Sequence, residues 1–317
     1  MTRNTFAGWV ELSGFPKFTT TLIPFLLGAV LAWHDGYVID VPVLAVSFIA
    51  VFLLTDFCFV LNACSVYTDL KQKGVTFQVE GANSLHSTAV SGRFNALENG
   101  LISVKAAVTG AYLCVLVALP LSVLLWLPLD TGPLTMPLGL MGIFIAYSYS
   151  RGPRLSYHCL GELALTTGVA WLTVFSGYYL QAHQVSWLPT VVALPWMIDA
   201  FKLKLTRELP DFEYDSLINR NTLAIRLGKE LTAKLYLPLT LGSWAAFIPL
   251  LWLGVPYYSL LLLAVPMFYT AKSVILMHRG DWKNRDGLRT ITKNAFTGMI
   301  FIPVALIGVF VVSIMMG

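Results

Sequence analysis

Two acidic side chains in the stretch LPDFEYDSLINRNTLAIRLGKE, at residues 209–230, have a spacing that suits metal chemistry. Asp211 and Asp215 are spaced i, i+4, so on a helix they point the same way, one turn apart. Like charges at that spacing repel each other, whereas a divalent cation makes the pair favourable. Mg²⁺ prefers a few carboxylates together with phosphate oxygens. An acidic start of a solvated helix, which the helix dipole favours, explains the same pair, so the spacing alone leaves both interpretations open.

A second polar stripe ends an apolar run, in VLNACSVYTDLKQKG at residues 60–74. Asn62, Ser65 and Asp69 are spaced i, i+3, i+7 and share one helical face. Polar residues at a helix end that enters a loop are a sufficient explanation of this stripe. Its interest is that Asp69 would complete a metal site if it faced the first acidic pair across a bundle of helices.

The elements that must position these residues are membrane helices. The chain has 317 residues, of which 56% are hydrophobic and 12% charged, against about 25% charged in an average soluble domain. Spanning the hydrocarbon takes about 20 apolar residues as helix, and continuous runs without alternation argue against strands. We expect an all-α integral membrane protein, a single domain over residues 1–317, with nine transmembrane helices at about 18–34, 42–64, 101–127, 134–150, 160–181, 186–206, 232–253, 257–278 and 294–315. The cysteines have no paired spacing and are interpreted as small buried hydrophobes.

The basic residues predict the orientation of the bundle. All 21 lysines and arginines lie before the first span or in the links at about 65–105, 151–158, 202–234 and 272–293. The rule that cytoplasmic loops are positive places the N-terminus and these links in the cytoplasm. These links also hold most of the acids, which topology does not require, and the mixture of both signs suits a metal-bridged, polyanionic ligand. The expected location is the cell inner membrane if the protein is bacterial, with the mouth of the site, at loops about 65–100 and 207–231, on the cytoplasmic side.

Four stretches resemble the UbiA-type intramembrane prenyltransferase superfamily, most closely the 1,4-dihydroxy-2-naphthoate prenyltransferases of menaquinone synthesis. The acidic stretch is similar to that family's second aspartate motif, D-x-x-x-D, followed by T-L-x-x-R-L-G at residues 222–228. The other three are LSGFPKFTTTLIPFLLGAVLAW at residues 12–33, YSRGPRLSYHCLGELALTTGVAWLTVFSGYYLQ at residues 149–181 and VSGR at residues 90–93. The resemblance implies a nine-helix fold and a Mg²⁺-dependent ionisation of an isoprenyl diphosphate, followed by prenyl transfer to an aromatic acceptor.

The first motif departs from the family pattern, which usually reads N-D-x-x-D-x-x-x-D. With Asp69 as the central aspartate, Ser65, Val66 and Lys73 replace the Asn, the first Asp and the last Asp. In the alternative register Asn62 takes the place of the Asn, and either way one carboxylate remains where two or three are expected. The resemblance therefore implies Asp69, Asp211 and Asp215 as catalytic metal ligands, Asn62 as a further metal ligand, and Glu80 or Asn83 as candidates for a replacement ligand.

Ionising an allylic diphosphate creates a polyanionic leaving group and an allyl cation. Cationic side chains stabilise the leaving charge, and the candidates for diphosphate binding are Lys17, Lys71, Lys73, Arg151, Arg154 and Arg207. Aromatic rings stabilise the cation, and the candidate substrate or cation pocket comprises Ser65, Tyr67, Tyr147, Tyr149, Tyr157, Glu162 and Asp199. The positive-inside rule and anchoring at the membrane interface are the alternative explanations of these basic and aromatic residues.

Three functions are compatible with this pattern. The first is an aromatic prenyltransferase of the quinone pathway, with an isoprenyl diphosphate, an aromatic acceptor and the lipid bilayer as partners, Mg²⁺ as cofactor and no nucleic acid. The second is a UbiA-type terpene cyclase, a lyase that acts on the diphosphate without an acceptor. The third is a transporter or other non-enzyme, which predicts inverted repeats with broken helices at the midplane; the sequence shows no convincing repeat.

Overall fold

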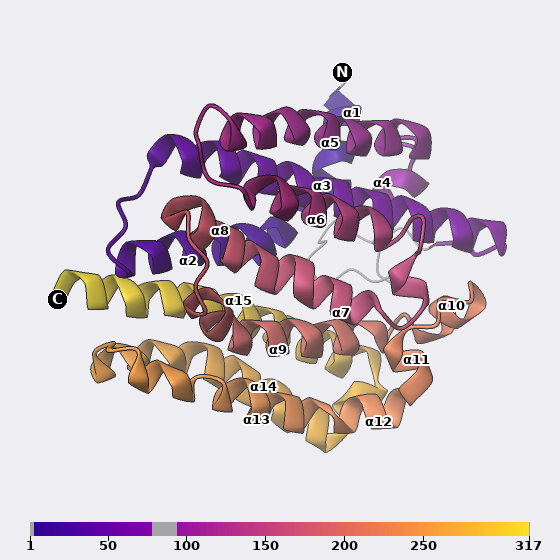
Figure 1. Cartoon of the computed structure of the whole chain (residues 1–317). Coiled ribbons are helices and arrows are strands. Elements are labelled where there is room, and N and C mark those ends of the chain that lie inside the picture. The colour runs from indigo at the N-terminus through magenta and orange to yellow at the C-terminus, as the bar shows by residue number, and fades with distance from the viewer. Residues whose placement is uncertain (1–2, 78–93, 317) are drawn as a thin grey trace.

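The computed structural model describes residues 3–77 and 94–316, apart from the side chains of residues 3, 4, 15 and 16. Helices make up 80% of the structure, and no strand occurs within the described ranges. A single isolated β-bridge joins His158 to Asn221. The predicted all-α class is confirmed (Figure 1).

The helices follow one another along the chain with short links. The first half contains α1 (Arg3–Ser13), η1 (Phe15–Phe18), α2 (Thr19–His34), α3 (Val41–Gln72), α4 (Asn95–Glu98), α5 (Val104–Trp126), α6 (Thr135–Ser148), η3 (Leu155–Tyr157), α7 (Gly161–Leu165), the π-helical turn η4 (Thr166–Trp171) and α8 (Leu172–Ala182). The second half contains α9 (Leu188–Glu208), α10 (Phe212–Leu217), α11 (Leu223–Leu227), α12 (Lys229–Lys234), α13 (Tyr236–Ala245), η5 (Ile248–Trp252), η6 (Tyr257–Leu263), α14 (Ala264–Arg279), η7 (Asp281–Lys283) and α15 (Arg285–Met316).

Each of the nine predicted spans falls on a helical segment, but the count of nine membrane crossings is not confirmed. Within the described residues, six segments are long and apolar enough to cross a membrane: Val41–Gln72, Val104–Trp126, Gly161–Ala182, Lys229–Trp252, Tyr257–Arg279 and Arg285–Met316. Two further apolar helices, α2 and α6, are shorter. The predicted span at 186–206 is α9, which ends in the charged run KLKLTRE and is not among the six.

Large apolar side chains on the outside of the bundle fit a lipid environment. Leu116, Leu163, Trp252 and Leu261 are each more than half exposed, and extended exposed apolar surface marks contact with a membrane or a partner. Together with the six apolar segments, this makes the chain an integral membrane protein.

Glycine allows one of the closest helix contacts in the bundle. A Cβ on Gly28 of α2 would lie 2.1 Å from the carbonyl oxygen of Val174, and one on Gly177 of α8 would lie 2.0 Å from that of Phe25. Small residues let helix backbones approach in this way inside membranes. The α2–α8 contact therefore depends on both glycines.

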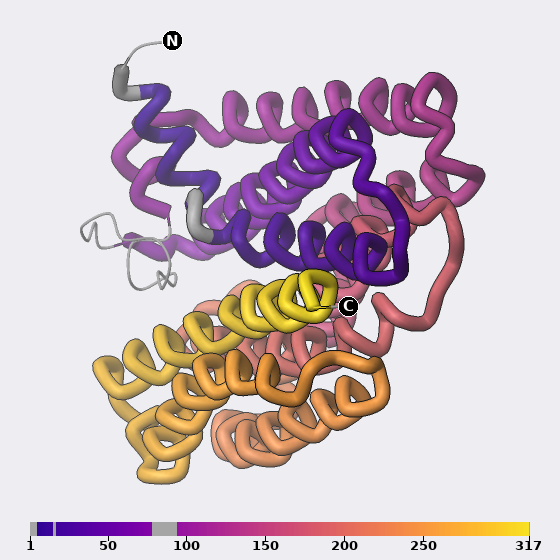
Figure 2. The backbone as a smooth tube through the Cα atoms, turned by 90° about the vertical axis from the view of Figure 1, so that its left-hand side faces the viewer, coloured from indigo at the N-terminus to yellow at the C-terminus, as the bar shows by residue number. Residues whose placement is uncertain are grey.

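The remaining helices pack side by side around this contact. The main pairs are α3 with α5, α14 with α15, and α9 with α13. The two views show the N-terminal helices gathered in one part of the bundle and the C-terminal helices in the other (Figures 1 and 2). The short helices α4, α10 and α11 lie at the end of the bundle opposite the C-terminus (Figure 1), and the candidate site lies at that end.

Candidate functional site

A cavity of about 270 Å³ runs between the helices, with walls from α2, α3, α5, α6, the α7–α8 segment, α9 and α15. One end is polar, and its residues come from η1, from α3, from the ends of α6 and α9 and from the links that follow those last two helices. The residues at this polar end are Lys17, Asn62, Tyr149, Lys204, Arg207, Glu208, Asp211, Asp215 and Arg220. The rest of the lining is mostly small or aliphatic, so the cavity joins a charged mouth to an apolar interior.

The acidic pair of the second motif lies at the mouth. Asp211 immediately precedes the first residue of α10, and the amide of Asp215 donates a 2.8 Å hydrogen bond to the Asp211 carbonyl, so the two residues are one turn apart. Both side chains are buried and both line the cavity. The pattern thus places two carboxylates where a ligand entering the cavity would meet them.

Arg220 holds Asp215 in place. Its Nη1 donates to both carboxylate oxygens of Asp215, at 3.2 and 3.4 Å, and its own amide donates to the Asp215 carbonyl at 2.8 Å. Both side chains are about 3% exposed. Burial by itself lowers the pKa of the Arg220 guanidinium, but the Asp215 carboxylate and neighbouring groups outweigh it and raise that pKa above its ordinary value, so the pair stays ionised.

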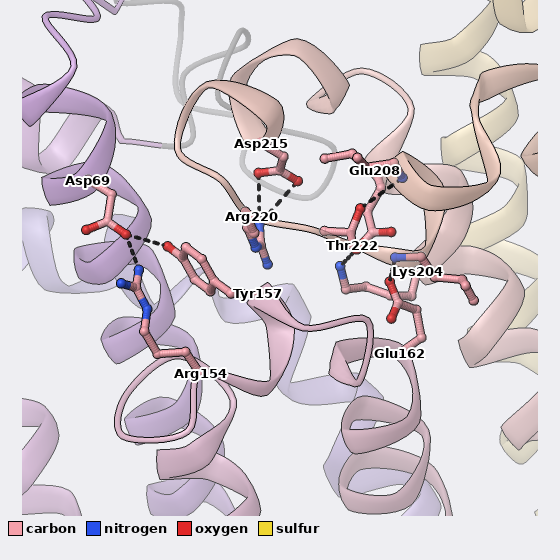
Figure 3. Close-up of polar contacts among 11 residues, drawn as sticks. Asp69, Arg154, Tyr157, Glu162, Lys204, Glu208, Asp215, Arg220 and Thr222 are labelled. Carbon is pink, nitrogen blue, oxygen red and sulfur yellow. Dashed lines mark hydrogen bonds and ion pairs between the residues drawn. The ribbon is translucent and has the colours of Figure 1, made fainter.

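Backbone hydrogen bonds tie the loop that carries Arg220 to the link before α7. The Cys159 amide donates to the Asn221 carbonyl at 2.8 Å, and the Asn221 amide donates to the Tyr157 carbonyl at 3.2 Å. Two residues further on, the Leu223 amide donates to Glu162 Oε1 at 3.2 Å. Glu162, the acid of the L-G-E sequence, does not line the cavity. It accepts this hydrogen bond from outside the cavity and so helps to orient the segment that follows the second acidic motif (Figure 3).

Asp69 of the first motif lies in a neighbouring polar network. It forms an ion pair with Arg154 and accepts a 2.7 Å hydrogen bond from the Tyr157 hydroxyl. The Arg154 guanidinium lies over the Tyr157 ring at 3.6 Å, and Arg220 approaches the same ring at 5.6 Å. Tyr157 therefore stands between Asp69 and the Asp215–Arg220 pair, as Figure 3 shows. Burial, and then the hydrogen bond to Asp69, raise the pKa of Tyr157 to about 12, so this hydroxyl remains a donor throughout the physiological range.

A third charged group completes the polar end. Lys204 and Glu208 of α9 form an ion pair one turn apart, and both line the cavity. Arg207 lies between them in sequence and lines the cavity too. The end of α9 thus delivers two cations and a carboxylate to the mouth.

The structure brings together some of the sequence-predicted residues and separates others. Six line the cavity: Lys17, Asn62, Tyr149, Arg207, Asp211 and Asp215. The eleven outside its lining are Ser65, Tyr67, Asp69, Lys71, Lys73, Tyr147, Arg151, Arg154, Tyr157, Glu162 and Asp199. Of these, Asp69, Arg154, Tyr157 and Glu162 still belong to the adjoining networks.

Several of the separated residues have partners elsewhere. Lys71 and Tyr67 both donate to Glu98, at 2.7 and 2.8 Å. Asp199 accepts a 2.6 Å hydrogen bond from Lys202, and the two form a buried ion pair. Glu80, Asn83 and the VSGR stretch lie outside the described residues.

Sequence reasoning missed three residues at the mouth, namely Lys204, Glu208 and Arg220. A signal for the first two exists, because residues 204, 207, 208 and 211 follow the i, i+3, i+4, i+7 pattern of one helical face. Arg220 carries no such periodic signal, since it lies in a loop whose path is fixed by its pairing with the link before α7.

The side chains at the mouth could hold Mg²⁺ only if substrate phosphates and water supplied the remaining ligands. No group of three or more His, Cys, Asp or Glu side chains that could hold a metal occurs among residues 3–77 and 94–316. Mg²⁺ is nevertheless commonly held by one or two carboxylates and completed by substrate phosphates and water. Asp211 and Asp215, the latter paired with Arg220, supply two such carboxylates to the cavity wall, whereas Asp69 lies outside the cavity lining and pairs with Arg154 and Tyr157.

Known proteins match the chain in sequence and in fold. The UbiA prenyltransferase family model matches residues 21–289. The 1,4-dihydroxy-2-naphthoate octaprenyltransferase of Bacillus subtilis is 26% identical over 66% of this chain, and that of Escherichia coli is 28% identical over 52%. The chain spans 62% and 55% of the lengths of these relatives. A solved UbiA homologue from Archaeoglobus fulgidus bound to GPP and Mg²⁺ is similar in fold, with a TM-score of 0.64 at 15% identity over 95% of this chain and 99% of that one.

Proposed function

The chain belongs to the UbiA prenyltransferase family, and we propose that it ionises an isoprenyl diphosphate and transfers the prenyl group to an aromatic acceptor of the naphthoate type. The observation that carries the proposal is the cavity, which joins buried carboxylates and cations at one end to an apolar interior at the other. A prenyl diphosphate has the same division into a polyanionic head and an apolar tail. The names of the curated relatives support the aromatic acceptor.

The residues at the mouth divide the work of binding the head group. Lys17, Lys204, Arg207 and Arg220 line the polar end, and we assign them to the diphosphate oxygens, whose charge grows as the carbon–oxygen bond breaks. The bonding electrons leave with the diphosphate, and the allyl cation remains in the apolar part. Tyr149 lines the cavity near this point and offers a ring face to the cation.

The acceptor ring then supplies the electrons for the new carbon–carbon bond. The ring recovers its aromaticity by losing a proton, or carbon dioxide where the attacked carbon bears a carboxylate. The apolar walls exclude water from the cation before the ring reaches it. Asn62 lines the polar end of the cavity, and its Oδ1 is buried with no hydrogen-bond partner in the described structure. We assign this oxygen to a hydroxyl of the acceptor.

Mg²⁺ is proposed as the cofactor, with Asp211 and Asp215 as its protein ligands. When bound it supplies positive charge that neutralises the leaving diphosphate. Arg220 holds the Asp215 carboxylate in position. Asp69 binds Tyr157 and Arg154 and thereby helps to position the neighbouring loop that carries Asp215 and Arg220. The mouth is proposed to face the cytoplasm, as the basic links predict.

The test is a product analysis with purified protein in lipid nanodiscs. Geranylgeranyl diphosphate is supplied with and without 1,4-dihydroxy-2-naphthoate, in Mg²⁺ or in EDTA, and products are identified by mass spectrometry. We expect a prenylated naphthalene product that needs both the acceptor and Mg²⁺. A cyclic hydrocarbon or alcohol formed without the acceptor would overturn the proposal in favour of a terpene cyclase, and no turnover with any acceptor would overturn both.

A further inference from the structure

The length of the apolar part of the cavity can be estimated from the lining residues of two of its helices, α3 and α6. On α3 the lining extends from Asn62 back to Ser47, and on α6 it extends from Tyr149 back to Thr135. At a rise of about 1.5 Å per residue, the fifteen steps from Ser47 to Asn62 span roughly 22 Å and the fourteen steps from Thr135 to Tyr149, the residue after α6, span roughly 21 Å. The two walls agree, so the space beyond the polar end is a channel of that length.

An isoprenyl tail can be compared directly with this length. Each isoprene unit adds four main-chain bonds, and an extended polypeptide advances roughly 1.2 Å per main-chain bond. One extended unit therefore spans roughly 4.7 Å by the same measure. A channel of about 21 Å takes between four and five units.

A glycine lies halfway along the channel. Gly142 of α6 lines the cavity seven residues before Tyr149, which places it roughly 10 Å below the polar end. A Cβ at Gly142 would lie 3.6 Å from Leu54 Cδ1 and 3.7 Å from Leu172 Cδ2. These are ordinary contact distances, so a methyl group is accommodated, whereas a longer side chain must enter the channel.

The wall facing α6 has an unusual backbone. The π-helical turn η4 interrupts the α7–α8 segment, and its residues Gly168 and Val169 line the cavity. A Cβ on Gly168 would lie 2.8 Å from Ile145 Cγ2, so η4 and α6 are in close contact. π-helical turns inside α-helices occur frequently at functional sites, and this one holds the α6 wall in position beside Gly142.

We propose that this channel selects the length of the prenyl donor, that it accepts a tail of about four isoprene units, and that Gly142 is a specificity-determining position two units below the head group. The inference rests on the proposed prenyl-transfer function and adds to it the size class of the donor. It predicts that a tail of eight units, which is almost twice as long as the channel, is a poor substrate.

The test compares geranyl, geranylgeranyl and octaprenyl diphosphates, with two, four and eight isoprene units, in the wild type, Gly142→Leu and Gly142→Ala. In the wild type we expect the highest kcat/KM with four units and a value about tenfold or more lower with eight. Gly142→Leu should lower kcat/KM for four units by about tenfold or more and leave that for two units within about twofold. Gly142→Ala should resemble the wild type, because its Cβ fits.

Gly242→Leu is the matched control. Gly242 lies on α13, away from the cavity lining, and a Cβ there meets nothing within 4 Å. This variant should keep the wild-type preference. Equal kcat/KM for four and eight units in the wild type would overturn the proposal, as would a Gly142→Leu variant that loses activity with two and four units equally while remaining folded.

A binding readout separates failure of this inference from failure of the proposed function. The thermal unfolding midpoint of each variant is measured with geranyl or geranylgeranyl diphosphate present and with neither. If no diphosphate is turned over, but geranylgeranyl diphosphate stabilises the wild type and not Gly142→Leu while geranyl diphosphate stabilises both, the channel stands without the reaction. If both diphosphates stabilise both proteins equally, the channel does not select tail length.

Discussion

Replacing Arg220 with methionine should destabilise the protein and abolish its turnover, because the change strands the Asp215 carboxylate. Both side chains are about 3% exposed, and the guanidinium donates to both Asp215 oxygens. Removing one partner of a buried ion pair typically costs about 3–5 kcal/mol, since the remaining charge is left uncompensated. Both residues line the cavity, so water reaches the stranded carboxylate, and we expect the lower end, about 3 kcal/mol.

The assay is unfolding in mixed micelles followed by intrinsic fluorescence, with Arg226→Met as the matched control. Arg226 lies on α11 in the same loop region and its side chain is exposed, so its replacement should change the free energy of unfolding by about 0.5 kcal/mol or less. An Arg220→Met protein with wild-type stability would refute the reasoning. So would one that keeps full turnover, because Arg220 is assigned to the diphosphate.

The contribution of the Asp215–Arg220 pair to stability should not change over the accessible pH range. The pKa of Arg220 is raised in the folded protein, so its contribution to stability is fully present below the unfolded pKa and is lost only as pH rises through the higher folded value. That window lies above any pH at which the protein is handled. Raising the pH to about 10 should therefore not reproduce the loss caused by Arg220→Met.

Three further predictions concern the acids and the topology. Asp211→Asn and Asp215→Asn should each lower kcat, measured per folded protein, by about a hundredfold or more in the product assay, and near-wild-type activity in either would remove the metal assignment. Asp69→Asn should be about as damaging as Asp211→Asn, because it weakens the contacts to Arg154 and Tyr157 that fix the neighbouring loop; full activity would exclude the first motif from the site. In a cysteine-free background, an impermeant thiol reagent should label Asn284→Cys only from the cytoplasm and Val38→Cys, which is 89% exposed, only from outside. The reverse pattern would contradict the proposed orientation.

The fold could be predicted largely from the sequence because apolar length determines membrane helices. Each predicted span coincides with a helical segment to within a few residues, except where polar extensions lengthen α3 and α15. The count of crossings was less secure, because α2, α6 and α9 fall short of the usual length or apolarity. Hydropathy also gives no sign of the π-helical turn η4, which depends on how the α7–α8 segment packs against α6.

The site could be predicted only where its residues follow a helical period. Asp211 and Asp215 are one turn apart and lie at the mouth as their spacing indicates. The partners of Asp69 could not be predicted, because Arg154 and Tyr157 reach it through a link whose position depends on two backbone hydrogen bonds to Asn221. Nor could the spacing show that Lys71 is paired with Glu98 rather than directed toward a ligand. Contacts between loops that are distant in sequence follow no periodic pattern, so this part of the site could not be predicted from a single sequence.

The balance of charge at the mouth predicts a single Mg²⁺. Among the described lining residues, four cations (Lys17, Lys204, Arg207 and Arg220) stand against three carboxylates (Glu208, Asp211 and Asp215), a formal net charge of +1 with Glu208 counted as ionised in its pair with Lys204. A prenyl diphosphate carries about three negative charges at neutral pH, since the last proton of such a phosphate titrates near pH 6. One Mg²⁺ therefore brings the assembly to about neutrality, whereas a second would leave about two positive charges uncompensated among largely buried side chains.

In this proposal the protein cations supply the positive charge of a second metal ion, which the missing carboxylates of the first motif would otherwise have bound. We expect Mn²⁺ titration by electron paramagnetic resonance, with a prenyl thiodiphosphate present, to give one bound ion per chain and a Mg²⁺ dependence of turnover with a Hill coefficient near one. Arg207→Gln, which removes one cation, should raise the Mg²⁺ concentration needed for half-maximal turnover. Two bound ions per chain in the wild type would show that residues beyond Asp211 and Asp215 complete the metal site and that the charge argument is wrong.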